Sequence, residues 1–369
     1  MIVECINVIS LKCSKCEFSA DLSTINSFFC PKCGSFYDLI LDVKSVKGVV
    51  NDLSELKSLS PCIKRSVVLG EGRTPLINFH GNLYLKLENL NPTGSFKDRG
   101  AALAISWVKN VGKFKTVIED SSGNAGIAVS AYSAGAGLKA RIYVPSTIPE
   151  GKYLMLRVFG AEVIKAGTRN DAHRKATSDR EGLYVGHVIN PLFIEGMKDI
   201  ALEIVKDLRS VPDTILAPVA SGTLILALWK GFNELRELGL IDRIPRLISV
   251  QACGYSTLKD MVKTYYIECD HPSELADALR LTIVPRINQI ANAVKGSSGF
   301  NMVVGDKALV KALKELWVRG ITAEPSSAAT YAAYRYAMKE GIDLGNLVVA
   351  IITGSGLKYV KDIGRLIAT

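Results

Sequence analysis

Short runs rich in strand-favouring residues alternate with longer amphipathic segments through most of the chain. The short runs predict strands at 83–88, 115–119, 140–144, 162–165, 183–185, 214–218, 246–251 and 347–353. The intervals predict helices at 96–110, 124–135, 151–159, 170–180, 195–209, 223–238, 306–319 and 325–340. This alternation predicts parallel sheets with helices on both faces. Ligands of such sheets bind where the strands end and loops lead into helix N-termini.

The composition indicates a well-buried protein that is too large for one core. The chain has 369 residues, of which 48% are hydrophobic and 7% aromatic. This length suits two moderate domains with a small appendage. The formal net charge is +9. Because no run of Lys and Arg is interleaved with aromatic residues, we expect anionic small-molecule partners rather than nucleic acid, with a merely solvated surface as the alternative.

No segment predicts export or a membrane span. Residues 1–20 carry charges in place of an apolar signal core. The longest uncharged stretch, 214–229, is short for a span and contains Pro218, Ser221 and Gly222. We therefore expect a soluble cytoplasmic protein. Eight cysteines in that setting predict reduced thiols rather than a disulfide framework.

Four cysteines are spaced as two metal-binding turns, Cys13-x-x-Cys16 and Cys30-x-x-Cys33. Each turn aims two thiolates at one point, which predicts a tetrahedral Zn²⁺ site in a zinc ribbon over residues 1–42. A structural role is favoured over a nucleic-acid contact, since no basic and aromatic surface accompanies it. The other cysteines match no such pattern and are expected in the core or at the surface: Cys5, Cys62, Cys253 and Cys269.

Lys97 follows a Gly-Ser turn and lies at the predicted start of a helix. The partial positive charge of a helix N-terminus disfavours a second cation there and favours a neutral amine. A neutral amine attacks aldehydes to form a Schiff base. A surface lysine is the simpler interpretation, and the neighbouring loops decide between the two.

Three further small-residue loops each follow a predicted strand and precede a helix, at 121–126, 218–223 and 353–358. Such loops bind anions through backbone N–H groups, and Asn124 adds an amide donor. No dinucleotide or P-loop motif, metal-binding histidine spacing or serine hydrolase motif is visible. A lysine that accepts an aldehyde, together with a phosphate-binding loop, indicates pyridoxal phosphate (PLP).

The chain resembles the threonine synthases, within the fold type II group of PLP enzymes that also includes serine and threonine dehydratases and the tryptophan synthase β chain. The matching segments are Gly70–Leu76, Asn91–Gly100, Ser122–Asn124, Asn190-Pro191 with Glu195-Gly196, Glu324–Ala329 and Thr353–Lys358. An N-terminal zinc ribbon also occurs in some threonine synthases. The implied fold has two parallel-sheet α/β domains, like those of the tryptophan synthase β chain, preceded by the ribbon.

The resemblance implies a role for each loop. Lys97 would carry the cofactor and move protons at Cα and Cβ, Asn124 would bind the 3′-oxygen of PLP, and Thr353 would face the pyridine nitrogen. The loop of Ala220, Ser221, Gly222, Thr223 and Leu224 would hold the cofactor phosphate, and Ser121, Ser122 and Gly123 would bind the substrate carboxylate. The implied reaction turns O-phospho-L-homoserine and water into L-threonine and phosphate.

A phosphorylated substrate needs its own cationic site. Lys152 and Arg174 lie where the family carries basic residues, and Asn190 is a third candidate contact; two solvated cations are the alternative interpretation. The chain departs from the family at Met155, at Leu192-Phe193 and at Ser355. These departures leave PLP intact and weaken the case for phosphohomoserine.

Two other functions stay open. The first is a related enzyme that acts on another amino acid, such as a serine or threonine dehydratase or a cysteate or cysteine synthase. The second is a zinc-ribbon nucleic-acid module on a degenerate enzyme. The expected domains are the ribbon (1–42), a linker with the first part of a large domain (43–112), a small α/β domain (113–188) and the rest of the large domain (189–369). A homodimer is usual for the family.

Overall fold

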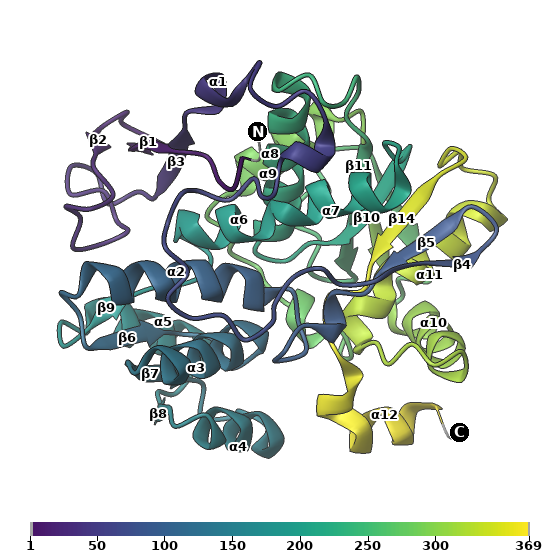
Figure 1. Ribbon diagram of the computed structural model, residues 1–369. Helices are drawn as coiled ribbons and strands as arrows, with labels where there is room; N and C mark the ends of the chain where they lie inside the picture. The colour runs from purple at the N-terminus through teal and green to yellow at the C-terminus, as the bar shows by residue number, and fades with distance from the viewer. Residues whose placement is uncertain (1–2, 368–369) are drawn as a thin grey trace. The chain divides into compact units, whose positions relative to one another are not determined.

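The computed structural model describes residues 3–367, and the chain divides into two compact units. The first comprises Met1–Gly72 and Asn91–Asp199, and the second comprises Arg73–Leu90 and Ile200–Thr369. Each unit contains one parallel or mostly parallel sheet. The strands and helices are labelled in Figure 1.

The first unit has a four-stranded parallel sheet in the order β8-β7-β6-β9. Its strands are β6 (Thr116–Glu119), β7 (Lys139–Val144), β8 (Glu162–Lys165) and β9 (Leu183–Tyr184). Its longer helices are α2 (Lys97–Val111), α3 (Asn124–Ala136), α4 (Glu150–Val158), α5 (Arg169–Ser178) and α6 (Pro191–Met197). The N-terminal segment forms an antiparallel sheet in the order β2-β1-β3, from β1 (Val8–Cys13), β2 (Ser19–Ala20) and β3 (Tyr37–Leu41), followed by α1 (Val43–Val46) and the 3-10 turn η1 (Leu53–Glu55).

The second unit has a seven-stranded sheet in the order β12-β13-β11-β10-β14-β5-β4, in which only the β4–β5 pair is antiparallel. Its strands are β4 (Leu76–His80), β5 (Leu83–Lys86), β10 (Thr214–Pro218), β11 (Arg246–Ala252), β12 (Thr264–Ile267), β13 (Asn301–Val304) and β14 (Val348–Ile351). Its helices are α8 (Thr223–Glu237), α9 (Ile287–Gly296), α10 (Asp306–Val318), α11 (Pro325–Lys339) and α12 (Val360–Ile367), and α7 (Asp199–Leu208) begins at the boundary. The 3-10 turns are η2 (Glu88–Leu90), η3 (Asp277–Leu279) and η4 (Gly356–Tyr359).

Every strand predicted from the sequence is present, and the α/β class with parallel sheets is confirmed. The prediction of a single helix at 195–209 is wrong, because the segment forms α6 and α7. Pro191 occupies the first turn of α6, and the Asn190 side chain caps it by accepting a hydrogen bond from the Leu192 N–H. The helix therefore begins four residues earlier than its apolar pattern indicates.

The expectation of reduced, unpaired thiols is wrong at four cysteines, which form the disulfides Cys5–Cys62 and Cys253–Cys269. Backbone pairing brings the first pair together, since the Cys62 N–H donates to the Ile6 carbonyl. The second pair follows the ends of β11 and β12, two strands of the same sheet. Neither pairing can be read from local spacing, because the partners lie 57 and 16 residues apart.

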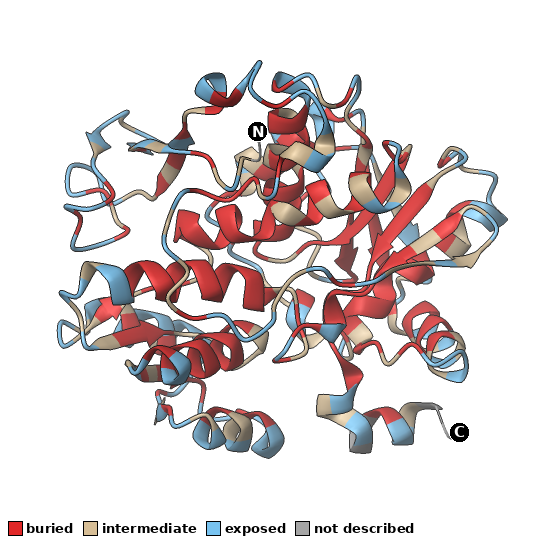
Figure 2. Cartoon of the chain, viewed as in Figure 1, coloured by how far each residue is buried: buried red, intermediate tan, exposed pale blue. Residues whose placement is uncertain are grey.

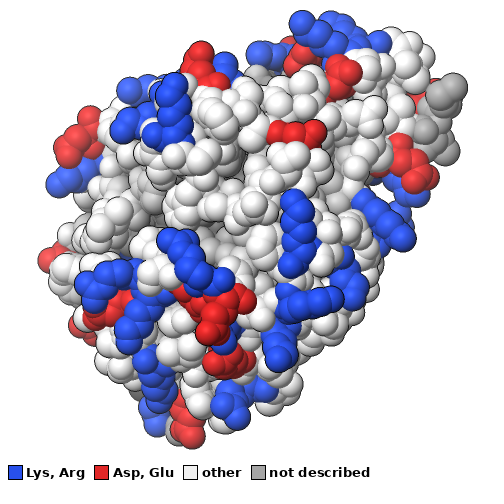
Figure 3. Space-filling model, turned by 90° about the vertical axis from the view of Figure 1, so that its left-hand side faces the viewer, with Lys and Arg blue, Asp and Glu red and all other residues white. Residues whose placement is uncertain are grey.

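The surface carries both signs of charge. On the face drawn in Figure 3, Lys and Arg side chains lie among Asp and Glu side chains and do not form one continuous basic area. A membrane-spanning candidate, meaning a helix of sufficient length and apolar character, is absent between residues 3 and 367.

Candidate active site

Lys97 is the first residue of α2 and is 7% exposed. The preceding turn is fixed by Gly94, whose φ of 79° favours glycine, and by Asp98, which accepts hydrogen bonds from the Thr93 N–H and hydroxyl. Burial lowers the pKa of the Lys97 amine from 10.5 to about 7, and the nearby charge of Glu119 only partly opposes this effect. A large fraction of this amine is therefore neutral and nucleophilic near pH 7.

Close helix packing holds Lys97 in place. Residues 97–108 of α2 and all residues of α6 are buried, as Figure 2 shows. A Cβ atom on Gly100 would lie 2.4 Å from the Phe193 ring, and one on Gly196 would lie 2.3 Å from the Arg99 carbonyl oxygen. Only glycine allows the two helices to approach so closely, and a rigid α2 fixes the position of the amine at its start.

The loop after β6 is the anion-binding candidate of the first unit. Its backbone turns tightly into α3, since a Cβ on Gly126 would lie 1.9 Å from the Ser121 carbonyl oxygen. The Gly123 N–H donates to the Ser121 hydroxyl, and no side chain caps the N-terminus of α3. Asn124 is the first residue of this helix, so the residues predicted from the sequence to bind an anion lie at a helix N-terminus.

Two carboxylates directly before this loop each contact a histidine side chain. The sequence analysis missed this cluster. Glu119 is fully buried and lies 3.0 Å from His187 Nδ1. Asp120 lies 2.7 Å from His173 Nδ1 and accepts a hydrogen bond from the Tyr184 hydroxyl at 2.8 Å. The acidic pair at a strand end is visible in the sequence, but its partners lie 53 to 68 residues away.

The Asp120–His173 contact shifts both pKa values in opposite directions. The hydrogen bond to Asp120 raises the pKa of His173 above its ordinary 6.5, although desolvation opposes this shift. Burial alone would raise the pKa of Asp120, but the hydrogen bond and charge of His173 and the Tyr184 hydroxyl lower it overall. The ion pair thus exists over the pH range between the two titrations.

We expect the stabilisation by this pair to depend on pH in a defined direction. It is present below the ordinary pKa of histidine and is lost as pH rises through the raised pKa of His173, or as pH falls through the lowered pKa of Asp120. The melting temperature of the wild type should exceed that of His173→Gln most near pH 6, and the gap should narrow in alkaline buffer. His271→Gln, at a histidine whose ring lies against the neighbouring Pro272 carbonyl, is the control. A gap that is constant with pH would contradict the interpretation.

The second unit contributes the loop from β10 to α8. Gly222, the N-cap residue of α8, has a φ of 80°, and a Cβ there would lie 2.0 Å from Ile290 Cδ1. No side chain caps this helix N-terminus, and the hydroxyl oxygens of Ser221 and Thr223 lie 3.5 Å apart beside it. This combination of helix N-terminus and hydroxyl groups is chemically suited to a phosphate group.

Thr353 lies just beyond the end of β14 and is 5% exposed. Its hydroxyl oxygen lies 2.9 Å from the Ser327 hydroxyl oxygen on α11. The two residues come from two separate sequence motifs, 324–329 and 353–358, which the sheet brings together in the second unit.

The candidate substrate contacts differ in their environments. Lys152 on α4 is 6% exposed, whereas the Arg174 side chain is 77% exposed and pairs with Asp171 on its own helix at 2.8 Å. Both ends of the Asn190 amide are engaged within the chain, since its Oδ1 caps α6 and its Nδ2 donates to the Val185 carbonyl. Phe193 packs against Gly100 of α2, so this departure from the family pattern places an apolar ring at the start of α6.

Four cysteine thiols in the N-terminal segment form a compact cluster. The sulfur atoms of Cys13, Cys16, Cys30 and Cys33 all lie within 4.8 Å of one another. Cys13 and Cys33 lie 3.5 Å apart, and Cys16 and Cys30 lie 3.7 Å apart. Four soft ligands at such distances are compatible with one tetrahedral ion.

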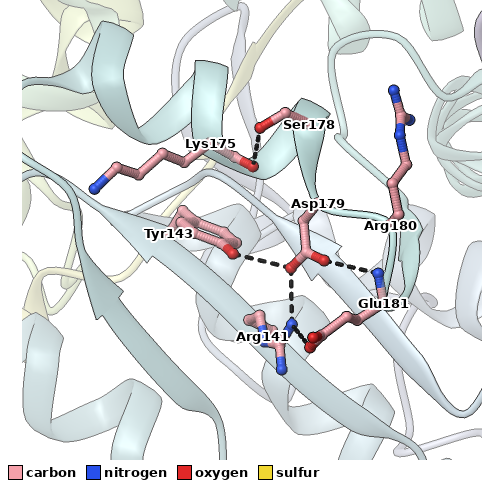
Figure 4. Close-up of a pocket in the computed structure, with 7 residues that line it drawn as sticks. All are labelled: Arg141, Tyr143, Lys175, Ser178, Asp179, Arg180 and Glu181. Atoms are coloured by element: carbon pink, nitrogen blue, oxygen red, sulfur yellow. Dashed lines mark hydrogen bonds and ion pairs between the residues drawn. The ribbon is translucent and has the colours of Figure 1, made fainter.

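A pocket of about 380 Å³ lies in the first unit, away from the carboxyl ends of the strands, and Figure 4 shows the side chains that line it. One of them is Arg141 on β7, which pairs with Asp179 at 2.8 Å and with Glu181 at 2.7 Å. The Tyr143 hydroxyl also donates to Asp179. Because the pocket is lined by the end of α5 and the turn that leads into β9, it lies at the amino end of that parallel strand, and the charges of Arg141, Asp179 and Glu181 are paired with one another across the turn.

A model of the family described as "Pyridoxal-phosphate dependent enzyme" matches residues 67–354. The chain belongs to this family. The resemblance seen in the motifs is thereby confirmed, and PLP is the cofactor of the family. Among its relatives are the threonine synthases of Methanocaldococcus jannaschii (32% identical over 376 residues, 94% of this chain and 92% of that protein) and Synechocystis sp. (36% over 306 residues, 79% and 78%).

Solved structures of PLP enzymes share the fold. A fungal L-serine ammonia-lyase from Rhizomucor miehei superposes with a TM-score of 0.67 at 22% identity, over 80% of this chain and 98% of that one. The O-acetylserine dependent cystathionine beta-synthase from Helicobacter pylori superposes with a TM-score of 0.63 at 24% identity, over 80% and 98%. The fold type II architecture is therefore shared with enzymes of more than one reaction type.

The residues of this chain fit the cofactor of the family. A buried amine with a lowered pKa suits the aldehyde, and the N-terminus of α8 suits the phosphate. The Ser95 hydroxyl, two residues before Lys97, is fully buried and finds no hydrogen-bond partner within residues 3–367. A buried polar atom of this kind usually has a partner, which a bound ligand would supply.

Proposed function

We propose that this protein is a threonine synthase, which converts O-phospho-L-homoserine and water into L-threonine and phosphate. The observation that carries the proposal is the buried amine of Lys97, of low pKa, in a chain similar to threonine synthases over most of its length. When bound, PLP supplies the electron sink that makes the substrate hydrogens acidic. Lys97 holds the cofactor and moves protons at Cα and Cβ of the substrate.

The other loops bind and orient the cofactor and the substrate. Asn124 donates to the 3′-oxygen of the cofactor, and the amides of 121–123 bind the substrate carboxylate. Residues 220–224 hold the cofactor phosphate, and the Thr353 hydroxyl faces the ring nitrogen. A hydroxyl partner at this nitrogen leaves the ring a weaker electron sink than a carboxylate would, which suits elimination and replacement.

Incubation of purified protein with O-phosphohomoserine tests the function. Assays of threonine and of phosphate should find the two products in equal amounts. Phe193 and Leu192 are fully buried, so this part of the site offers no cation for a phosphate group. That observation favours, as a second candidate, a related enzyme that acts on another amino acid, such as a dehydratase or a cysteine-forming synthase. Deamination of serine or threonine without turnover of phosphohomoserine would select the second candidate.

We propose Lys152, Arg174 and Asn190 as contacts of the substrate phosphate. Lys152→Ala should raise KM for phosphohomoserine about tenfold or more with a smaller change in kcat, since a charged hydrogen bond is lost. The exposed Arg174 should contribute less. Lys115→Ala, at an exposed lysine before the amino end of β6, is the matched control. An unchanged KM in Lys152→Ala would identify this lysine as structural.

The four clustered thiols support a structural Zn²⁺ in an N-terminal ribbon, residues 1–42. Metal analysis should find one zinc ion per chain, and Cys30→Ser should lose it. Protein purified without any metal, with unchanged stability, would contradict the site. We further propose a cytoplasmic homodimer, with residues 43–112 and 189–369 forming the large domain and 113–188 the small one.

A further inference from the structure

The hydroxyl group of Thr353 has one hydrogen-bond partner among the described residues, the hydroxyl of Ser327 at 2.9 Å. Ser327 is fully buried in the first turn of α11. Its oxygen also accepts a hydrogen bond from the Gly354 N–H at 2.7 Å, and its hydroxyl is placed to donate to the Gly354 carbonyl at 3.2 Å, so Thr353 and this carbonyl compete for one proton. The Ser327 hydroxyl therefore touches both the residue that faces the cofactor ring and the backbone next to it.

Counting protons assigns a direction to this contact. A serine hydroxyl carries one proton. The Gly354 carbonyl already accepts a hydrogen bond from the Glu324 N–H at 2.9 Å, so it does not depend on Ser327. The Ser327 proton is thus best placed on the shorter contact, toward the Thr353 oxygen. The resulting series runs from the Gly354 N–H through Ser327 to Thr353, and each bond strengthens the next.

We propose that Ser327 is a positioning residue that fixes the Thr353 hydroxyl as a hydrogen-bond donor, so that the site selects the cofactor with its ring nitrogen unprotonated. A hydroxyl that accepts from Ser327 directs its own proton elsewhere. The inference rests on the proposed function, because that function places the ring nitrogen at Thr353. It adds a cause for the weak electron sink, namely the hydroxyl of Ser327 on α11, whereas Thr353 itself lies in the loop after β14.

The surrounding backbone keeps this arrangement rigid. Ala323 and Ser355 form an antiparallel bridge, and the Gly356 N–H donates to the Thr322 carbonyl at 2.7 Å. A Cβ atom on Gly354 would lie 2.4 Å from the Glu324 carboxyl group. The loop that carries Thr353 is therefore tied to residues 322–324, directly before Ser327, which leaves the two hydroxyls little freedom to separate.

The state of the ring nitrogen can be measured without turnover, by ¹⁵N NMR of protein loaded with PLP labelled at that atom. The wild type should give the resonance of an unprotonated pyridine that accepts a hydrogen bond. In Ser327→Ala the Thr353 hydroxyl can also accept, so part of the signal should move toward the protonated range. The kcat of this variant should fall about tenfold, as expected for one lost neutral hydrogen bond.

Thr330→Val is the matched control. The Thr330 hydroxyl is fully buried on the same helix, but it donates to the Ser327 carbonyl and not to Thr353. This variant should lose stability as Ser327→Ala does and keep the wild-type ¹⁵N resonance. A protonated ring nitrogen in the wild type, or the same resonance in wild type and Ser327→Ala, would overturn the inference alone. A protein that takes up no cofactor would overturn the proposed function and the inference with it.

Discussion

Lys97→Ala should abolish the visible absorption band of the bound cofactor and lower turnover by at least about 10³-fold, because the same amine carries the cofactor and moves the protons. Absorption spectra and steady-state kinetics measure the two effects. Lys109→Ala, near the other end of the same helix, should change neither. A variant that keeps the band would show that another group holds the aldehyde.

The pH dependence of cofactor uptake provides an independent check on Lys97. The lowered pKa, about 7, means that the neutral amine dominates above neutral pH and not only above pH 10.5. The rate at which the apoprotein forms the absorption band should therefore rise to a half-maximum near pH 7. The unfolded chain binds the proton of the Lys97 amine more tightly than the folded chain does. The apoprotein should therefore become more stable as pH rises from about 7 toward 10.5.

Gly222→Ala should weaken cofactor binding by about 30-fold to 100-fold, the equivalent of about 2–3 kcal/mol for left-handed backbone and a forced displacement of Ile290. Titration of the apoprotein with PLP gives the affinity. Gly239→Ala separates the two causes, since Gly239 has a similar φ of 77° and nothing within 4 Å of its Cβ position. That control should lose stability and keep its affinity. Equal cofactor affinity in wild type and Gly222→Ala would show that the 220–224 loop does not hold the phosphate.

Local signals in the sequence predicted most of the strands of the two parallel sheets but not all of them. Strands such as β6 and β10 are apolar runs bounded by small-residue loops, and both were located to within a residue. The edge strand β4 was missed because it is only half-buried and lacks a continuous apolar run. The strand β13 was missed because its four residues follow a glycine-rich turn and resemble a loop.

The candidate site divides in the same way. Lys97 and the loops after β6, β10 and β14 have short motifs, so their residue types and order along the chain were sufficient to identify them as candidates. The histidines held by Glu119 and Asp120, and the contact of Ser327 with Thr353, join residues that are far apart in sequence. Such pairs depend on the tertiary fold and have no local pattern.

The disulfide between Cys5 and Cys62 encloses all four clustered thiols in one covalent ring. A strong reductant in the purification buffer would protect those thiols but would open the ring, at a loss of about 4 kcal/mol in the chain-entropy model. An oxidising buffer would keep the disulfide closed but would allow the four thiols to form incorrect disulfides. Purification with a zinc salt and without dithiothreitol would keep the Cys5–Cys62 disulfide closed and the four clustered thiols bound to metal.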